Sequence, residues 1–146
     1  MTIAAALERE HRDIDGCLEA FLDDPAGAAD VLRTGLAALR RHIYLEEELL
    51  FPPIRAGLEM PVQVMLAEHG QIWRLMDRAL AELDDDPAAA VPVVQEMLAV
   101  LDRHNAKEEP VIYPHADTDL APDQADQLDL FIGMGGMPAG WVCERA

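Results

Sequence analysis

A short segment that occurs twice in the chain restricts its fold more than any other feature. The first copy runs from His42 to Pro52 and the second from His104 to Pro114. Both copies read His-x-x-x-Glu-Glu-x, followed by two apolar residues, an aromatic residue and a proline. A His and a Glu four residues apart lie on one face of an α-helix. Each copy therefore predicts a helix whose imidazole nitrogen and carboxylate oxygen could contact one bound ion.

The repeat extends upstream of both copies. Glu10-His11 precedes the first copy by about the same distance as Glu68-His69 precedes the second. The chain thus reads as two similar halves, each with one His on a first helix and His-x-x-x-Glu on a second. Two such halves predict an all-α protein, a four-helix bundle made of two similar helix pairs, with four His and two Glu pointing inward.

Composition agrees with a helical fold and excludes some functions. The 146 residues are 51% hydrophobic but only 5% aromatic, which suits helices more than sheets. A formal net charge of −17 argues against nucleic acid or an anionic membrane as partner, because both attract basic surfaces. No apolar run reaches transmembrane length, and Cys17 and Cys143 predict no disulfide framework. We therefore expect a cytoplasmic protein with no nucleic-acid partner and no membrane partner.

The apolar spacing predicts where the helices begin and end. Four helices are expected over residues 2–22, 28–51, 61–83 and 88–109, the first capped by Thr2. Pro52 and Pro53 are expected to end the second helix, and Pro110 to kink or end the fourth. The bundle is predicted at residues 1–115. Residues 116–146 are predicted to form a C-terminal extension, with a short helix at 123–131, a Gly/Met-rich loop and a Trp/Cys tail.

Six polar residues occupy inward positions of these helices: His11, His42, Glu46, His69, His104 and Glu108. A lone His on an apolar face is more often a hydrogen-bonded core residue than a ligand. Here all four helices carry one, and two helices add a carboxylate one turn later. Burying an unpaired ionised carboxylate is costly, and two cations would compensate both. The set therefore predicts a metal site.

The ligand types indicate which metal this site would hold. Mixed imidazole and carboxylate ligands point away from Cys-rich zinc sites and from all-oxygen calcium or magnesium sites. Six ligands shared by two ions give two His each, with Glu46 and Glu108 available to bridge. That set approaches the two-His-one-carboxylate pattern of redox-active non-haem iron. The predicted cofactor is two non-haem iron ions, with Mn or Zn as substitutes.

Three acidic residues lie near the predicted ligands. Asp15 follows His11 by four residues and is a further ligand, a group that supports a ligand, or a helix-surface acid. Glu47 and Glu109 lie about 100° around the helix from their neighbours, so we expect them on the surface or behind the ligands.

Several other residues are assigned structural roles. Tyr113 and Phe51 are expected to fill the core at one end of the bundle. His115, beyond Pro114, is expected in a solvated loop. Cys17 is expected to be a small buried side chain, and Trp141 to pack against the bundle.

The six residues, with Phe51-Pro52 and Tyr113-Pro114, resemble the hemerythrin-like (HHE cation-binding) family over about residues 2–115. The resemblance implies an up-down-up-down four-helix bundle around a non-haem di-iron centre. It also implies that the four His are terminal iron ligands and that Glu46 and Glu108 bridge the irons. Members bind dioxygen reversibly, sense oxygen or redox state, or handle nitric oxide and iron.

Two positions depart from the oxygen-carrying members of that family. The carriers place a fifth His at the position of Trp73, which cannot ligate and instead fills the space or shields the pocket. Their second carboxylate is a more distant Asp, whereas Glu108 lies four residues after its His. The site is therefore more symmetric and poorer in nitrogen donors, which favours oxidation of the iron over stable oxygen carriage.

Three functions remain open at this point. The leading hypothesis is a non-enzymatic di-iron protein that binds oxygen or nitric oxide for sensing, storage or detoxification, with no catalytic residue. The first alternative is a di-iron redox enzyme: a ferroxidase, a peroxidase-like protein or a nitric-oxide/iron-repair protein. The second is a metal-dependent regulatory interaction module, which the acidic surface and the C-terminal tail allow.

Overall fold

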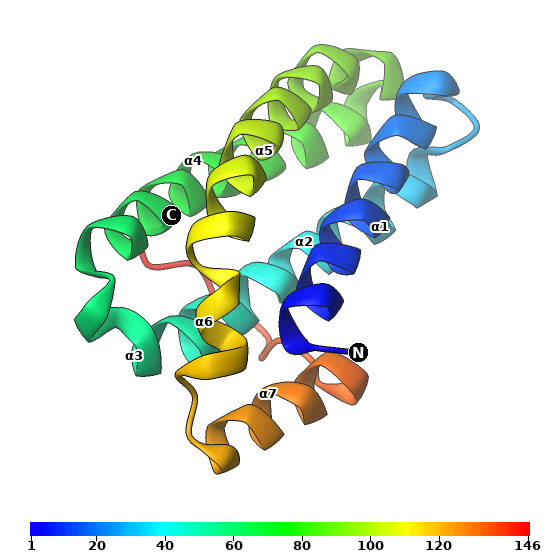
Figure 1. Ribbon diagram of the computed structural model, residues 1–146. Helices are drawn as coiled ribbons and strands as arrows, with labels where there is room; N and C mark the ends of the chain where they lie inside the picture. The colour runs from blue at the N-terminus through cyan, green and yellow to red at the C-terminus, as the bar shows by residue number, and fades with distance from the viewer.

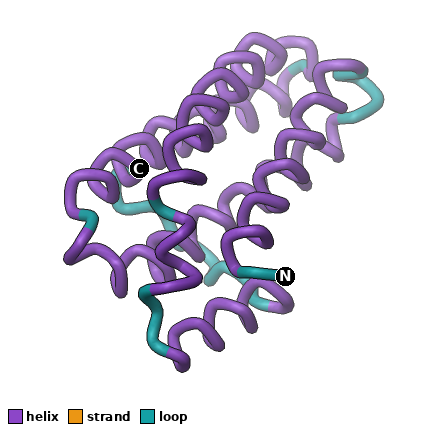
Figure 2. The backbone as a smooth tube through the Cα atoms, in the orientation of Figure 1, coloured by secondary structure: helices purple, strands orange, loops and turns teal.

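All regular structure in the computed structural model, which describes residues 1–146, is helical, as predicted (Figure 2). The elements are, in chain order, α1 (Ile3–Asp23), α2 (Ala29–Leu45), η1 (Glu46–Leu50), α3 (Phe51–Ile54), η2 (Arg55–Gly57), α4 (Glu59–Asp85), η3 (Pro87–Ala90), α5 (Val91–Val111), α6 (Tyr113–Thr118) and α7 (Pro122–Met134). The η1 element is a π-helical turn, and η2 and η3 are 3-10 turns. No helix combines the length and the apolar character needed to cross a membrane.

Four long helices form the body of the molecule. Helix α1 packs against α2 and α5, and α4 packs against the same two helices, so that the four close into a helical bundle (Figure 1). Thr2 caps α1 as predicted, because its side-chain oxygen accepts a hydrogen bond from the Ala5 amide at 3.1 Å. The prediction of an all-α bundle is confirmed.

The apolar core consists of two clusters of buried residues, with a polar layer between them. On α1, Leu7 belongs to one cluster and Ile14 to the other, while the buried His11 lies between them in the same stripe. A period of three to four residues keeps all three side chains on the inward face. Along the helix axis, the polar layer thus has one apolar cluster on each side of it.

The second helix does not end at Pro52, where we expected it to. A π-helical turn at Glu46–Leu50 follows α2, and the chain then continues as α3. Pro52 and Pro53 lie in the first turn of α3, where the fixed φ angle of proline fits the helix. In the fourth helix, α5 runs one residue past Pro110 to Val111, and α6 follows almost at once.

The C-terminal extension returns to the bundle. Helix α7 contacts α1, α2 and η1, and the last residues run back alongside α4 (Figure 1). Trp141 packs edge-on against Tyr44 and Trp73, with ring centroids 5.1 and 5.6 Å apart. His115 lies in α6, not in the loop that we expected, and pairs with Asp119 one turn later. The division of the chain at residue 115 stays a prediction.

Candidate metal centre

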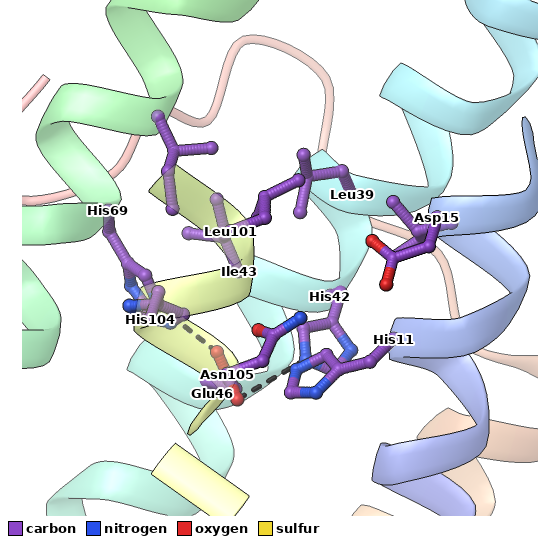
Figure 3. Close-up of a pocket in the computed structure, with 12 residues that line it drawn as sticks. His11, Asp15, Leu39, His42, Ile43, Glu46, His69, Leu101, His104 and Asn105 are labelled. Carbon is purple, nitrogen blue, oxygen red and sulfur yellow. Dashed lines mark ion pairs between the residues drawn. The ribbon is translucent and has the colours of Figure 1, made fainter. Parts of the chain in front are cut away.

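All six predicted ligands lie in the polar layer of the bundle. His11 is on α1, His42 on α2, Glu46 at the start of η1, His69 on α4, and His104 and Glu108 on α5. None of the six is more than 4% exposed. The close-up in Figure 3 shows how His11, His42, His69, His104 and Glu46 converge from these elements.

The ligand atoms fall into two overlapping sets. The first set consists of His11, His42, Glu46 and Glu108, and the second of Glu46, His69, His104 and Glu108. Within each set the ligand atoms lie within 4.8 Å of one another. Both carboxylates belong to both sets, so each could contact two ions through its two oxygens. The arrangement suits two metal ions side by side.

Unsatisfied polar atoms test whether these residues fit a cation. Glu46 Oε1, His69 Nε2 and Glu108 Oε2 are buried and make no hydrogen bond. Glu46 Oε1 lies 3.1 Å from His69 Nε2, an ion-pair distance without hydrogen-bond geometry. Leaving a buried polar atom without a partner costs about 1–3 kcal/mol. A cation between these atoms would satisfy all three, so the residues of this site fit a metal ion.

A second layer of carboxylates holds the outer nitrogen of every imidazole. The four Nδ1–carboxylate pairs are His11 with Glu109 at 2.8 Å, His42 with Glu10 at 2.9 Å, His69 with Glu47 at 2.7 Å, and His104 with Glu68 at 2.9 Å. A carboxylate on Nδ1 fixes the ring so that Nε2 faces a metal ion. In the sequence, the Glu-His and Glu-Glu pairs of the two halves are the signal for this layer. Glu47 and Glu109, which we expected on the surface or behind the ligands, lie behind His69 and His11 respectively.

Charge coupling shifts the pKa values of the inner residues. Burial lowers the pKa of His42, but Glu46 and Glu10 outweigh it and raise that pKa to about 10. Burial also lowers the pKa of His104, but Glu108 and Glu68 outweigh it and raise that pKa to about 10. Without a metal ion, these two imidazoles therefore carry a second proton and a positive charge at neutral pH. Metal binding must displace this proton from each of them.

The two inner carboxylates remain ionised although they are buried. Burial and Glu108 raise the pKa of Glu46, but His42 and His69 lower it further, so it lies below its ordinary value. Burial also raises the pKa of Glu108, which His104 and His11 bring well below the usual range. Both carboxylates therefore offer charged oxygens across the neutral pH range.

A small internal cavity adjoins the polar layer. Its walls combine the four imidazoles and Glu46 with apolar side chains of α1, α2, α4 and α5: Ile14, Leu39, Ile43, Ile72 and Leu101. About 10 Å³ of it is open to the centre of a water-sized molecule, which is about the minimum that one water requires. Asp15 and Asn105 complete the lining (Figure 3). The cavity therefore has room for about one water-sized molecule.

Asp15 and Trp73 have no direct contact with the six residues through hydrogen bonds or ion pairs. Burial raises the pKa of Asp15, against the opposing effect of His11, and its carboxylate lines the cavity. Trp73 is buried beneath Arg40 and against Trp141. The supporting roles predicted for Asp15 and Trp73 stay predictions.

Tyr113 is the residue whose role the sequence analysis missed. Its ring is fully buried, as expected of a core residue, but its hydroxyl lies among the ligand atoms. The hydroxyl donates to Glu46 Oε2 at 2.6 Å and also lies 3.0 Å from Glu108 Oε1. His11 Nε2 and His42 Nε2 are 2.8 and 3.0 Å from the same oxygen. The sequence contained one signal for this role: the two copies of the repeat differ at this position, where the first has Phe51 and the second has a tyrosine with a hydroxyl group.

Together, the fold and the site define a helical-bundle protein with a buried histidine–carboxylate site that fits metal ions. The family model of the hemerythrin HHE cation binding domain matches residues 2–116, and the chain belongs to this family. The resemblance inferred from the repeated motif is thereby confirmed.

Several curated proteins are similar to this chain. The iron-sulfur cluster repair protein YtfE of Yersinia pseudotuberculosis (strain YPIII) is 29% identical over 127 residues, which cover 78% of this chain and 54% of that protein. A probable iron-sulfur cluster repair protein of Haemophilus influenzae is 35% identical over 75 residues, or 49% of this chain and 30% of that protein. The chain thus spans about half the length of the Yersinia relative. No solved structure matches.

Proposed function

We propose that this protein holds two non-haem iron ions in an up-down-up-down four-helix bundle and binds a diatomic gas beside them. The gas is nitric oxide or oxygen, and the function is sensing, storage or detoxification in the cytoplasm. One observation carries the proposal: six buried ligand atoms form two sets that share two carboxylates, next to a cavity of molecular size. Bound iron would supply the open coordination positions and the electrons that such a ligand needs.

The chain itself would select and protect the ligand. The apolar walls formed by Ile43, Ile72 and Leu101 favour a small, weakly polar molecule and exclude bulk water. The outer carboxylates hold the imidazoles in place, so little reorganisation is needed when a ligand binds. Asp15 and Asn105 provide the polar edge of the cavity, where a bound oxygen atom could find a hydrogen-bond partner.

Iron-sulfur cluster repair is the second candidate function. The names of the relatives favour it, and so does Trp73, which stands where oxygen carriers have a fifth nitrogen ligand. Because the chain matches only about half of the Yersinia protein, the activity of that whole protein need not reside in the shared part. Delivery of iron to a cluster-free acceptor protein would distinguish repair from gas binding.

Gas titration of the iron-loaded protein tests the proposal. We expect about two irons per chain and a visible spectrum that changes when the anaerobic ferrous protein meets nitric oxide or oxygen. A protein that holds two irons and responds to neither gas would contradict gas binding. Turnover of peroxide or ferrous iron beyond one equivalent would instead favour an enzyme.

A pair of core variants separates the cavity from general stability. Leu101→Phe fills the cavity, and Leu83→Phe adds the same bulk in the core away from it. Overpacking costs each variant about 1–3 kcal/mol of unfolding free energy. We expect only Leu101→Phe to weaken gas binding while both retain two irons. Equal gas affinity in the two variants would show that the cavity is not the binding site.

A further inference from the structure

The two ligand sets differ in one hydroxyl group. Phe51 and Tyr113 occupy the same position of the repeat, nine residues after His42 and His104 respectively. Phe51 stacks on His69 with ring centroids 5.7 Å apart, and Tyr113 stacks on His11 at 5.3 Å. The two rings therefore play equivalent packing roles in the two halves. Only the ring in the second half carries an oxygen atom.

The Tyr113 oxygen has the spacing expected of a ligand atom. It lies 2.6–3.0 Å from one atom of each residue of the first set: His11, His42, Glu46 and Glu108. Ligand atoms at right angles on one ion, each about 2.1 Å from it, lie about 3 Å from one another. An ion contacted by the first set would thus be within reach of the hydroxyl oxygen as well.

The second set has no comparable donor. Glu46 Oε1, His69 Nε2 and Glu108 Oε2 belong to it and make no hydrogen bond, while Phe51 offers only its ring face. The cavity lies beside the imidazoles, and Tyr113 is not among its lining residues. The hydroxyl therefore does not obstruct the space where a small molecule would bind.

We propose that Tyr113 Oη is a fifth protein ligand of the ion held by the first set. The ion held by His69 and His104 would then keep the open position that faces the cavity. This inference rests on the proposed di-iron site. When the ligand bond forms, an oxygen–metal bond replaces the phenol O–H bond, and the proton leaves to the buffer. Phenolate oxygen is an established protein ligand of iron.

Spectroscopy of the iron-loaded full chain tests this assignment directly. Ferric iron bound to a phenolate absorbs visible light by charge transfer, and excitation in that band enhances the ring vibrations of the tyrosine in resonance Raman spectra. We expect both signals in the wild type and their loss in Tyr113→Phe, at an unchanged count of two irons. Tyr44, the second tyrosine of the chain, packs against Phe131 and Trp141 outside the site. Tyr44→Phe should therefore retain both signals.

The outcomes separate this inference from the di-iron proposal. A wild-type protein with two ferric ions and no phenolate band would overturn the Tyr113 assignment alone, even if Tyr113→Phe did not fold. A band that persists in Tyr113→Phe would overturn it as well. Absence of bound iron would instead refute the di-iron proposal. In Phe51→Tyr, the assignment predicts a second phenolate contribution, because the new hydroxyl would be placed near the second set.

Discussion

The Glu47 carboxylate provides the sharpest test of how the outer layer supports the ligands. Its side chain is only 5% exposed and accepts a hydrogen bond from His69 Nδ1 at 2.7 Å. Its other oxygen accepts the backbone N–H of Glu144 at 2.9 Å, which ties the C-terminal tail to the same group. Replacing Glu47 should therefore loosen a ligand without removing any ligand atom.

The size of the effect follows from what each substitution leaves behind. Loss of a carboxylate behind a ligating His costs about 10- to 100-fold in metal affinity. Glu47→Gln keeps an acceptor but loses the charge, so we expect iron to bind about tenfold more weakly, a loss of ~1.4 kcal/mol of binding free energy. Glu47→Ala leaves His69 Nδ1 buried without its partner, so we expect iron to bind about 100-fold more weakly. Glu109 is 30% exposed, so water can replace part of its role, and Glu109→Ala should cost less than Glu47→Ala.

Anaerobic competition with a chromophoric chelator measures these affinities. Glu59→Gln is the matched control, because Glu59 is 60% exposed and its side chain accepts hydrogen bonds from Arg55 and Gln63, neither of which belongs to a ligand set. A urea midpoint for each metal-free variant shows whether the fold itself has changed. If Glu47→Ala bound iron as tightly as Glu59→Gln, or more tightly than Glu109→Ala, the support assigned to the outer layer would be refuted.

Three further predictions concern protons, the tail and Glu46, one of the two carboxylates shared by both ligand sets. The pKa values of His42 and His104 are raised to about 10 by their neighbouring carboxylates. The ion pairs of the protonated imidazoles with these carboxylates therefore stabilise the metal-free protein fully below pH 6.5, and this stabilisation is lost as the pH rises towards 10. Urea midpoints should fall over that range while iron affinity rises, and calorimetry in two buffers at pH 7 should detect proton release. Gly70→Ala places a Cβ 2.3 Å from a backbone oxygen of the tail, which must therefore shift. Hydrogen exchange should speed up in residues 141–146. In the control Gly57→Ala, where the space around the new Cβ is open, it should not change. Glu46→Ala removes a ligand from both sets and leaves the Nε2 atoms of His42 and His69 without their buried carboxylate. Elemental analysis should therefore find at most one iron per chain, and the metal-free protein should lose about 3–5 kcal/mol of unfolding free energy.

The fold was largely predictable because the apolar residues follow a helical period. The turn between α2 and α3 was not, because periodicity assumes a uniform helix. At Glu46–Leu50 the chain adopts a π-helical turn, which inserts an extra residue and frequently occurs at functional sites. The same turn carries Glu47, whose carboxylate lies beside His69 on another helix. A uniform helix followed by a proline stop misses both features.

The six inner residues were predictable for a related reason, and their partners were not. Spacing along one helix shows which side chains share a face, but not what a neighbouring helix places opposite them. Glu10 and His42 are 32 positions apart, and Tyr113 and His11 are 102 apart. Only the packing of the helices brings these pairs together. The sequence contained the hydroxyl of Tyr113 but no indication of the direction in which it points.

Charge balance connects the acidic composition of the chain with this site. Six carboxylates either belong to the ligand sets or pair with an imidazole Nδ1: Glu10, Glu46, Glu47, Glu68, Glu108 and Glu109. Two cationic side chains compensate part of this charge, since Arg41 contacts Glu10 and Lys107 contacts Glu68. Two divalent ions, if bound as proposed, would balance the four remaining negative charges and offset the cost of burying them. Oxidation of both ions to the ferric state adds two positive charges, and a Tyr113 phenolate would neutralise one. Tyr113→Phe should therefore destabilise the ferric state relative to the ferrous state and raise the reduction potential of the centre.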